Sequence, residues 1–511
     1  MAVALATAGC TTGAESGGSG NTDTLTIAVG ADIDTFDPQA QVSASVIQRL
    51  QQVVESLTKL DVDGTLTPLL ATEWESAPDG MSWEFTLREG VTFSDGTPLN
   101  AAAVKFSLDR VNSPDTVKAR PDALVVIKST EVIDDTHVRI NLKSKYPALP
   151  RALSLPVGGI VSPDGTRKAP NSVQQVVAPV GTGPYVFQEN VKGDRLTLTA
   201  NQNYWGDKPT FATQIWKVVP EATSRLALLK SNGADIILDP PGTDLASLRE
   251  DDSVELTLVN ATNAVQLVMK TQSKQAPQLA DPTVRQALSH AINRDQIVKV
   301  LAYGAAEPLK SAVVPWTFGA CDANNYAYDP AKAKQMLADA GATNLRLRMG
   351  APNGRYLNDY KIGEAVAGDL RAAGVQVDLA NPTDFPTYLA TVYTPPQDAA
   401  LDIYIMGLGS VFLDGGHALR NYLKANFPPT GYNGGYYDSP EFDQMVNTLN
   451  QEGDETVRAG LICDAQKKLM QDAPAAFLYA LQVPVAMSAD LTGLIGHPAG
   501  MINPSWVKPK S

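Results

Sequence analysis

The segment 71–111 constrains the fold of this chain most, because strong local signals follow one another there without a break. Apolar and polar residues alternate over Ser82–Leu87, and a period of two predicts a strand with one buried face. Asp79-Gly80 and Asp95-Gly96 stand on either side of it, and such dipeptides favour turns because glycine adopts positive φ at little cost. The segment therefore predicts a strand with a turn at each end.

A helix is predicted directly after the second turn. Pro98 ends strand pairing because it has no N–H, and Asn100 is placed to cap a helix N-terminus. Val104, Leu108 and Val111 then fall at i, i+4 and i+7, which gives the helix one apolar face. Further strands and long helices alternate along the rest of the chain, which predicts α/β layers.

Length and charge limit the classes of protein that this chain can belong to. At 511 residues it is too long for one core and predicts about three or four domains. Its 44% of hydrophobic and 19% of charged residues are those of a folded globular protein. The net charge of −14 argues against a general binder of nucleic acids or anionic membranes, which needs basic patches. It identifies no ligand.

The N-terminal residues resemble a lipoprotein signal. Residues 5–10, LATAGC, are similar to a bacterial lipobox that ends at Cys10, although Thr7 stands where Leu or Val is usual. The first basic residue is Arg49, whereas a secretory signal begins with a basic region, so we expect residues 1–10 to be a partial signal. Residues 11–23 are rich in Gly, Ser and Thr and predict a flexible tether. The alternative is a flexible end with a chance cysteine. No apolar run of about 18 residues follows, so we expect no membrane span.

The ordered motifs of the chain resemble those of family 5 extracellular solute-binding proteins, the peptide/nickel class that serves ABC importers. In residues 71–111 the matching strings are W-E, D-G-x-x-W-E-F-T-L-R and G-V-T-F-S-D-G-T-P-L-N-A-A-A-V-K-F-S. Further matches are Gly181–Tyr185 with Asn203–Gly206, Asp281–Leu288 with Ile292–Arg294, and Tyr328–Pro330. The resemblance extends from about Asp23 to the C-terminus.

The resemblance implies an α/β fold of the periplasmic-binding-protein-like type II (cluster C), a two-lobed clamp with an extra domain in its first lobe. It places lobe I at 24–60, 178–266 and 484–511, the extra domain (lobe II) at 61–177 and lobe III at 267–483. The chain crosses between the lobes near Val265–Lys270 and Ala480–Pro484, where a hinge is expected. Arg285 and Arg294 are expected to be structural rather than to contact ligand.

Motifs of catalysis are missing from the sequence. It contains no G-x-S-x-G, H-E-x-x-H, Walker loop or C-x-x-C, and its four histidines show no metal-binding spacing. We therefore expect no enzyme, no metal site and no cofactor. A secreted hydrolase or a receptor-like sensor on this fold is the alternative of another class.

The binding role is expected to lie in residues 402–421. Ile403 and Ile405 predict a buried strand, and four nearby glycines permit the close backbone approach that a pocket wall needs; they are Gly407, Gly409, Gly415 and Gly416. By the resemblance, Leu408 stands where Trp is usual, and Val411 stands where peptide binders have an Asp that holds the ligand's α-amine. Asp414 matches a later Asp of the family pattern.

This departure carries a prediction about ligand choice. An ammonium buried without a carboxylate costs several kcal/mol, so a site with Val411 is not expected to select free amino termini through that position. Short peptides are then expected to bind about equally well after N-acetylation, unless Asp414 takes over as the amine anchor.

Other residues are expected to line the ligand cleft, although plain packing is the alternative for each. The resemblance places residues 39–46, including Ser43, along the cleft. Arg355 can fork onto a carboxylate or a phosphate, and aromatic rings can cover apolar ligand faces. The remaining candidates are Trp316, Phe318, Tyr356, Tyr388, Phe412 and His417.

Together these observations predict a lipid-anchored, monomeric substrate-binding protein outside the cytoplasm. It is expected to capture a short peptide or another polar small molecule and to deliver it to ABC permease subunits and their ATPases. A carrier of a sugar, an opine or a metal chelate is the alternative within the fold. Because an oxidising compartment favours paired cysteines, Cys321 and Cys463 are expected to form a disulfide.

Overall fold

A computed structural model describes residues 23–40, 43–113, 124–168, 176–324 and 326–510. The expected signal at 1–10, lipidation of Cys10 and most of the tether at 11–23 lie outside the described residues. Within the described ranges, no helix has both the length and the apolar character needed to cross a membrane.

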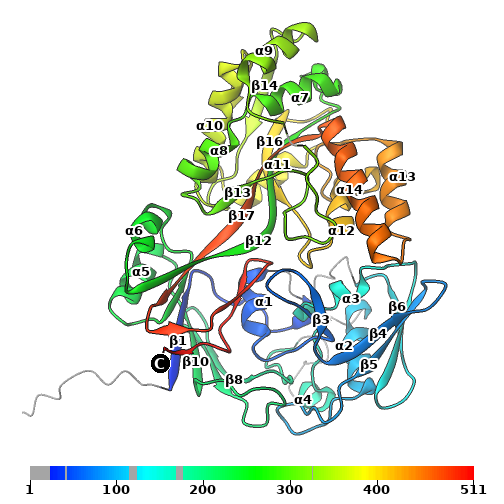
Figure 1. The fold of residues 1–511 in the computed structure, drawn as a ribbon, viewed down its shortest axis with the longest axis vertical. Coiled ribbons are helices and arrows are strands. Elements are labelled where there is room, and N and C mark those ends of the chain that lie inside the picture. The colour runs from blue at the N-terminus through cyan, green and yellow to red at the C-terminus, as the bar shows by residue number, and fades with distance from the viewer. Residues whose placement is uncertain (1–22, 41–42, 114–123, 169–175, 325, 511) are drawn as a thin grey trace, which may run out of the picture.

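The fold is built on one long mixed sheet that two lobes share (Figure 1). Its eleven strands include the order β15-β14-β16-β12-β17-β11-β1-β10-β9-β8. β12 (Val254–Met269) and β17 (Ala475–Ser488) are the two long antiparallel strands in the middle of this order. Strands on one side of this pair belong to lobe I and those on the other side to lobe III.

Lobe I holds the N-terminal strand, the strands parallel and antiparallel to it, and the C-terminal hairpins. Its elements are β1 (Thr24–Val29), α1 (Ala44–Leu50), β8 (Tyr185–Val191), β9 (Arg195–Ala200), β10 (Thr213–Val218), α5 (Ala222–Lys230), β11 (Ile236–Leu238), α6 (Leu245–Arg249), β18 (Leu491–Thr492), β19 (Ile495–His497), β20 (Met501–Asn503) and β21 (Lys508–Pro509).

Lobe II is the extra domain, a four-stranded antiparallel sheet with a hairpin and helices, at the lower right of Figure 1. Its elements are β2 (Thr58–Leu60), β3 (Leu66–Pro68), β4 (Ala71–Ser76), β5 (Ser82–Leu87), α2 (Ala101–Asn112), β6 (Ile127–Val132), β7 (His137–Leu142), α3 (Leu149–Ala152) and α4 (Pro163–Lys168). β2 lies within the segment 24–60 expected for lobe I, but it pairs with β3 and is therefore described with lobe II. The side chain of Asn100 accepts a hydrogen bond from the Ala103 N–H, and the predicted apolar face of α2 is buried. The predicted strand, turns, cap and helix in 71–111 are therefore confirmed.

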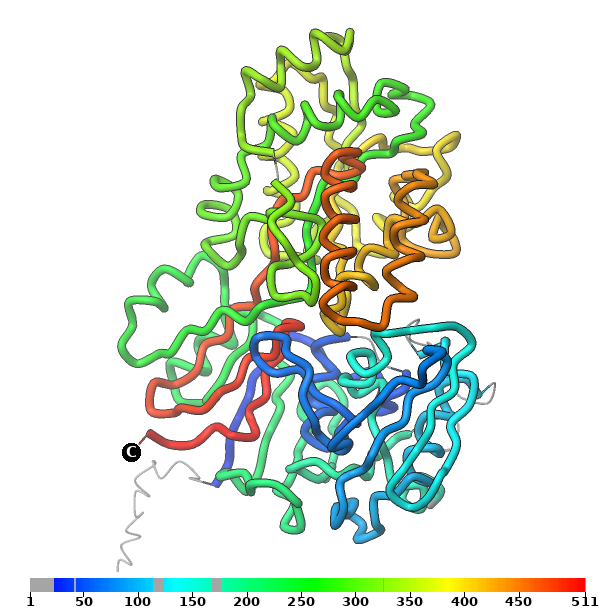
Figure 2. The backbone as a smooth tube through the Cα atoms, turned by 45° about the vertical axis from the view of Figure 1, so that its right-hand side comes forward, coloured from blue at the N-terminus to red at the C-terminus, as the bar shows by residue number. Residues whose placement is uncertain are grey.

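Lobe III forms the upper part of the molecule in Figures 1 and 2. Its elements are α7 (Pro282–His290), α8 (Arg294–Gln296), β13 (Ala306–Pro308), α9 (Pro330–Asp339), β14 (Arg346–Gly350), α10 (Asp359–Ala372), β15 (Gln376–Leu379), α11 (Phe385–Val392), β16 (Ile403–Leu408), α12 (Gly415–Leu419), α13 (Pro440–Leu449) and α14 (Glu455–Asp472). Short 3-10 or π turns lie at Pro38–Ala40, Pro156–Gly158, Gly242–Asp244, Pro277–Ala280, Ile297–Leu301, Arg420–Tyr422 and Lys424–Asn426.

A β-bulge marks where the long strands pass from one lobe to the other. Asn260 pairs with Gln482 and Ala264 pairs with Ala480, which leaves residues 261–263 outside the regular ladder. The crossing of β12 thus lies a few residues before the expected segment 265–270, whereas that of β17 falls at the expected segment 480–484.

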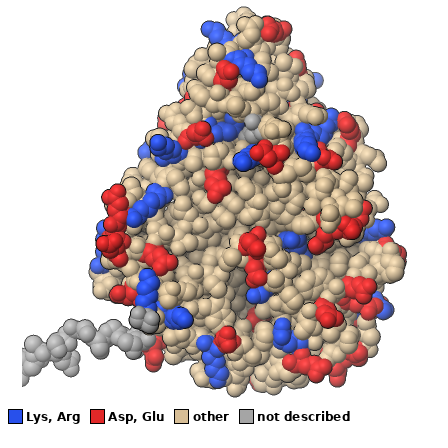
Figure 3. All heavy atoms as spheres, viewed as in Figure 1, with Lys and Arg blue, Asp and Glu red and all other residues tan. Residues whose placement is uncertain are grey.

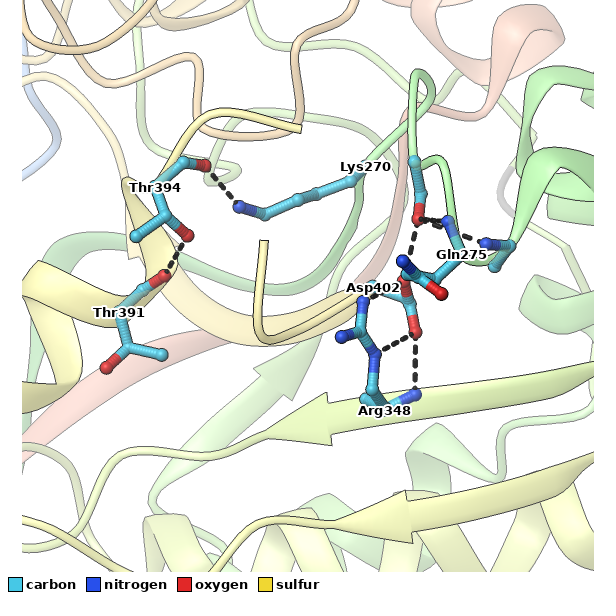
Figure 4. Close-up of polar contacts among 8 residues, drawn as sticks. Lys270, Gln275, Arg348, Thr391, Thr394 and Asp402 are labelled. Atoms are coloured by element: carbon cyan, nitrogen blue, oxygen red, sulfur yellow. Dashed lines mark hydrogen bonds and ion pairs between the residues drawn. The ribbon is translucent and has the colours of Figure 1, made fainter. Parts of the chain in front are cut away.

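Buried charges fix the start of β16, the strand that leads into the expected binding segment. Figure 4 shows Arg348 of β14 directed at Asp402, which accepts hydrogen bonds from its Nε and Nη2 at 2.9 and 2.8 Å. Burial raises the pKa of Asp402, but the hydrogen bonds from Arg348 outweigh it and hold the pKa below its ordinary value. Lys270, at the end of β12, donates to the Thr394 carbonyl at 2.7 Å, and burial lowers its pKa to about 8.

Arg285 and Arg294 are structural, as predicted. Both are almost fully buried, and their guanidinium groups donate to backbone carbonyls, among them those of Leu279 and Phe477. On the face of the molecule seen in Figure 3, basic and acidic side chains are interspersed rather than gathered into a patch of one sign.

Candidate functional site

Two adjoining cavities of about 550 and 540 Å³ open between lobes I and III. Thr262, Asn263, Arg355 and Val411 line both of them, so they form one space, which we call the interlobe cleft. Cavities of this size are typical of sites for small molecules. Thr262 and Asn263 belong to the bulge of β12, and the cleft therefore lies at the junction of the two lobes.

Lobe I supplies one wall of the cleft from three separate segments. Ser43 precedes α1, Asp239 follows β11, and residues 499–501 enter β20. The hydroxyl groups of Ser43 and Ser45 are 2.9 Å apart at the start of α1. This wall combines small polar and apolar residues, and Asp239 is its one charged residue among those described.

The end of β16 supplies the opposite wall. A Cβ atom at Gly409 would lie 1.9 Å from the Thr262 carbonyl oxygen, so only glycine lets β16 approach the bulge this closely. The Gly407 N–H donates to the Tyr356 hydroxyl at 3.0 Å. The close backbone approach predicted for this strand is therefore confirmed at Gly409.

Lobe III contributes two arginines to the cleft. The Arg355 guanidinium lies 5.5 Å from the ring centroids of both Tyr356 and Phe385, so aromatic faces hold it in place. Arg420 lines the same cavity. Within the described ranges no carboxylate forms an ion pair with either arginine. Two cationic groups therefore face the cleft without an anionic partner.

The structure brings six of the ten expected site residues to the cleft, and Phe318 is not among them. The six are Ser43, Arg355, Tyr356, Val411, Phe412 and His417. Val411 is 40% exposed and lines both cavities, whereas Phe412 is buried and also packs into the core of lobe II.

Tyr388 and Trp316 have structural roles instead. The Tyr388 hydroxyl donates to the Ile405 carbonyl at 2.7 Å in a buried position behind β16. The Trp316 indole donates to the Ala261 carbonyl at 2.9 Å and packs against a core cluster of lobe III. Neither is among the residues that line the two cavities, because each ring covers the backbone next to the cleft rather than the cleft itself.

Asp414 does not line the cleft, which corrects its expected place among the ligand-binding residues and removes it as an alternative amine anchor. It is fully buried, and Arg458 of α14 donates to both of its carboxylate oxygens at 2.7 Å. Burial raises its pKa, but the charge of Arg458 outweighs burial and holds that pKa below the ordinary value. Asp414 also accepts from the His417 N–H and caps α12, so its carboxylate is committed to the fold.

His417 lines the cleft as a neutral imidazole. Burial lowers its pKa to about 4, and its ring lies 4.4 Å from that of Phe412. Its buried Nδ1 atom has no hydrogen-bond partner among the described residues. A neutral ring nitrogen of this kind can accept a hydrogen bond or bind a metal ion.

Among the polar residues of the cleft that sequence reasoning missed are Asp239, Asn263 and Arg420. Arg420 lies within residues 402–421, the segment expected to bind ligand, but it was not one of the candidate side chains. Asp239 directly follows a short apolar strand and precedes Pro240 and Pro241, and polar residues at strand ends are common in sites. The position of Asp239 at the end of a strand is therefore the signal in the sequence that could have identified it.

A separate cavity of about 650 Å³ lies between lobe I and lobe II, away from β16. Glu55 lies on its wall and accepts hydrogen bonds from Thr182, Tyr204 and Trp205, each at 2.8 Å. Because these donors already satisfy the carboxylate, we interpret Glu55 as a structural residue that joins two segments of lobe I.

Comparison with known proteins identifies the family. The sequence model of the bacterial extracellular solute-binding proteins, family 5 (middle part), matches residues 65–427, which is most of the chain. This chain belongs to that family. The family comprises extracytoplasmic substrate-binding proteins of ABC importers rather than enzymes, so the chain is such a binding protein.

Relatives and solved structures agree with this assignment along nearly the whole chain. The glutathione-binding protein GsiB of Pectobacterium atrosepticum is 28% identical over 477 residues, which cover 92% of this chain and 91% of that protein. The structure of HbpA2 from Haemophilus parasuis has a TM-score of 0.85 at 24% identity and covers 96% of this chain and all of that one. NikA from Brucella suis, solved with Fe(III)-EDTA, has a TM-score of 0.81 at 24% identity over 95% of this chain and 100% of its own. These similarities establish the type II periplasmic binding protein fold.

Proposed function

We propose that this protein captures a short peptide with free carboxylates, of which glutathione is the test case, in the interlobe cleft. The observation that carries the proposal is the pair of guanidinium groups, Arg355 and Arg420, that face the cleft without an anionic partner. Planar guanidinium groups fork onto carboxylates through paired hydrogen bonds. The glutathione-binding relatives, 28% identical to this chain, support the choice of test ligand.

In this proposal the lobes close about the crossing of β12 and β17, and a permease then receives the ligand from the closed protein. We further propose that the protein acts as a monomer and is tethered to the membrane through a lipid on Cys10. ABC permease subunits and their ATPases are its partners.

Replacement of Arg355 by Gln is expected to weaken glutathione binding about tenfold to hundredfold, because a hydrogen bond to a charged group contributes about 1.5–3 kcal/mol. Isothermal titration calorimetry on the purified protein measures the change. Arg346→Gln is the matched control, because Arg346 pairs with Asp378 on the exposed surface of the same lobe. Equal affinities of wild type and Arg355→Gln would contradict the assigned role.

A metal-chelate carrier is the second candidate, and His417 favours it. His417 lines the cleft, and its buried Nδ1 has no hydrogen-bond partner among the described residues. The described residues contain no group of three metal-ligating side chains, so a metal ion would have to arrive with its own ligands. NikZ from Campylobacter jejuni was solved with Ni(L-His), although its 24% identity to this chain establishes only the fold. Binding of nickel–histidine but not of glutathione, with loss in His417→Ala, would select this function.

Lipidation of Cys10 is expected to be visible by labelling. In a bacterial host that processes lipoproteins, radiolabelled palmitate should enter the full-length protein and be absent from Cys10→Ala. Equal labelling of both proteins would show that the lipid is attached elsewhere, and no labelling of either would reject the anchor.

A further inference from the structure

We propose that Asp239 of lobe I holds the free amino group of the ligand, opposite the carboxylate site of Arg355 in lobe III. This inference rests on the proposed function and narrows the ligand to a zwitterionic short peptide. The position differs from the lobe III position at which Val411 stands, so it is a second way to bind an ammonium in the same cleft. It replaces the expectation from the sequence that a peptide and its N-acetylated form bind about equally well, because that expectation considered only Val411 and Asp414.

The backbone around Asp239 is held firmly in an unfavourable conformation. Asp239 has φ of +49°, a left-handed value that costs energy for any residue but glycine and is least costly for Asn and Asp. Its N–H donates to the Pro484 carbonyl of β17 at 3.0 Å, and its own carbonyl accepts from Arg225 of α5 at 2.7 Å. Such conformations persist where the surroundings enforce them, and they often mark binding sites.

The carboxylate of Asp239 lacks a partner of its own. It forms no hydrogen bond or ion pair with any described residue, although it lines a cavity and its side chain is reached by solvent through the cleft. Arg225 interacts electrostatically with Asp239 but forms no ion pair with it. Its N–H groups donate instead to the backbone carbonyls of Val219, Pro220, Leu238 and Asp239. An ammonium group from the ligand would supply the missing positive partner.

The charges that line the cleft match one class of ligand. Among the described lining residues there are two guanidinium groups, on Arg355 and Arg420, and one carboxylate, on Asp239. Glutathione carries the complementary set, two carboxylates and one ammonium. Because Asp239 and Arg355 line the same cavity from opposite lobes, one such ligand can bridge the two lobes with its own charges.

Calorimetry with glutathione and N-acetylglutathione tests the anchor. Acetylation removes the ammonium charge and is expected to weaken binding to the wild type at least tenfold. Asp239→Asn is expected to weaken glutathione binding by a similar factor and to leave N-acetylglutathione binding unchanged, so the difference between the two ligands disappears. Asn keeps the shape of the side chain and tolerates the left-handed conformation, and a thermal melt of the variant verifies that it is folded.

The matched control is Asp252→Asn, which makes the same change of charge at an exposed position of lobe I outside both cavities. It should retain the preference of the wild type for glutathione. Equal binding of the two ligands by the wild type, or an unchanged preference in Asp239→Asn, would overturn the anchor while the proposed function stands. If the wild type binds neither glutathione nor triglycine, the proposed function and the anchor fail together.

Discussion

Replacing Asp414 by Asn is expected to lower the free energy of unfolding by about 3–5 kcal/mol, because it leaves the Arg458 guanidinium buried without a charged partner. Both side chains are nearly inaccessible, at 0% and 4% exposure, and two hydrogen bonds of 2.7 Å join them. Urea unfolding of wild type and variant measures the difference.

Asp378→Asn is the matched control for this experiment. It removes the carboxylate that pairs with Arg346, but both partners there are more than half exposed, and such pairs contribute at most about 1 kcal/mol. If Asp414→Asn is no more destabilising than Asp378→Asn, the buried pair does not stabilise the fold as described.

The loss in Asp414→Asn should also depend on pH. The pKa of Asp414 is lowered in the folded protein, so its pairing contributes stability above the unfolded pKa of about 3.9 and loses it as pH falls through the lower folded pKa. The gap between wild type and variant is therefore expected to be full at neutral pH and to narrow below about pH 4. A gap that widens on acidification would contradict the assigned sign.

Loss of the disulfide between Cys321 and Cys463 is expected to destabilise the protein by about 2–5 kcal/mol. The bond closes a loop of 142 residues in lobe III, and a long loop loses much chain entropy when it is closed in the unfolded state. Urea unfolding of the Cys321→Ser/Cys463→Ser variant measures the effect. A thiol count on the denatured, unreduced protein with Cys10 replaced should find no free thiol.

The reductant itself provides the control for this second prediction. Dithiothreitol should shift the unfolding midpoint of the wild type towards that of the double variant and should leave the variant unchanged. Two free thiols in the untreated wild type, or equal stability of the two proteins, would show that the cysteines are unpaired.

Much of the fold could be predicted because its signals are local. In residues 71–111 the alternation, the turn glycines and the Asn100 cap each depend on neighbours within a few positions. The strand that ends at Leu408 and its closely packed Gly409 were predictable for the same reason, since apolar runs and glycines show in the sequence itself.

The direction of single side chains in the site depended on partners that are distant in sequence. Asp414 lies close to Val411 in the chain, yet Arg458, 44 residues away, draws it into the core. The backbone of Asp239 is fixed by β17 and α5, which are distant from it in sequence or joined to it only through the fold, and they leave its carboxylate unpaired among the described residues. The family pattern identified the strand that leads into the cleft. Charged side chains on distant elements determine which of the following residues reach the cleft.

The residues of the β12 bulge both line the cleft and connect the two lobes. Thr262 and Asn263 line the cleft, and they also lie in the three-residue interruption between the pairs Asn260–Gln482 and Ala264–Ala480. The ladder is interrupted at residues 261–263 and again between Val265 and Gln266, so the lobe closure proposed above would change the backbone torsion angles there. A ligand in the cleft would touch these residues and favour one set of torsion angles over another. Ligand binding would then change the shape of the whole molecule directly, and a membrane partner would recognise that shape.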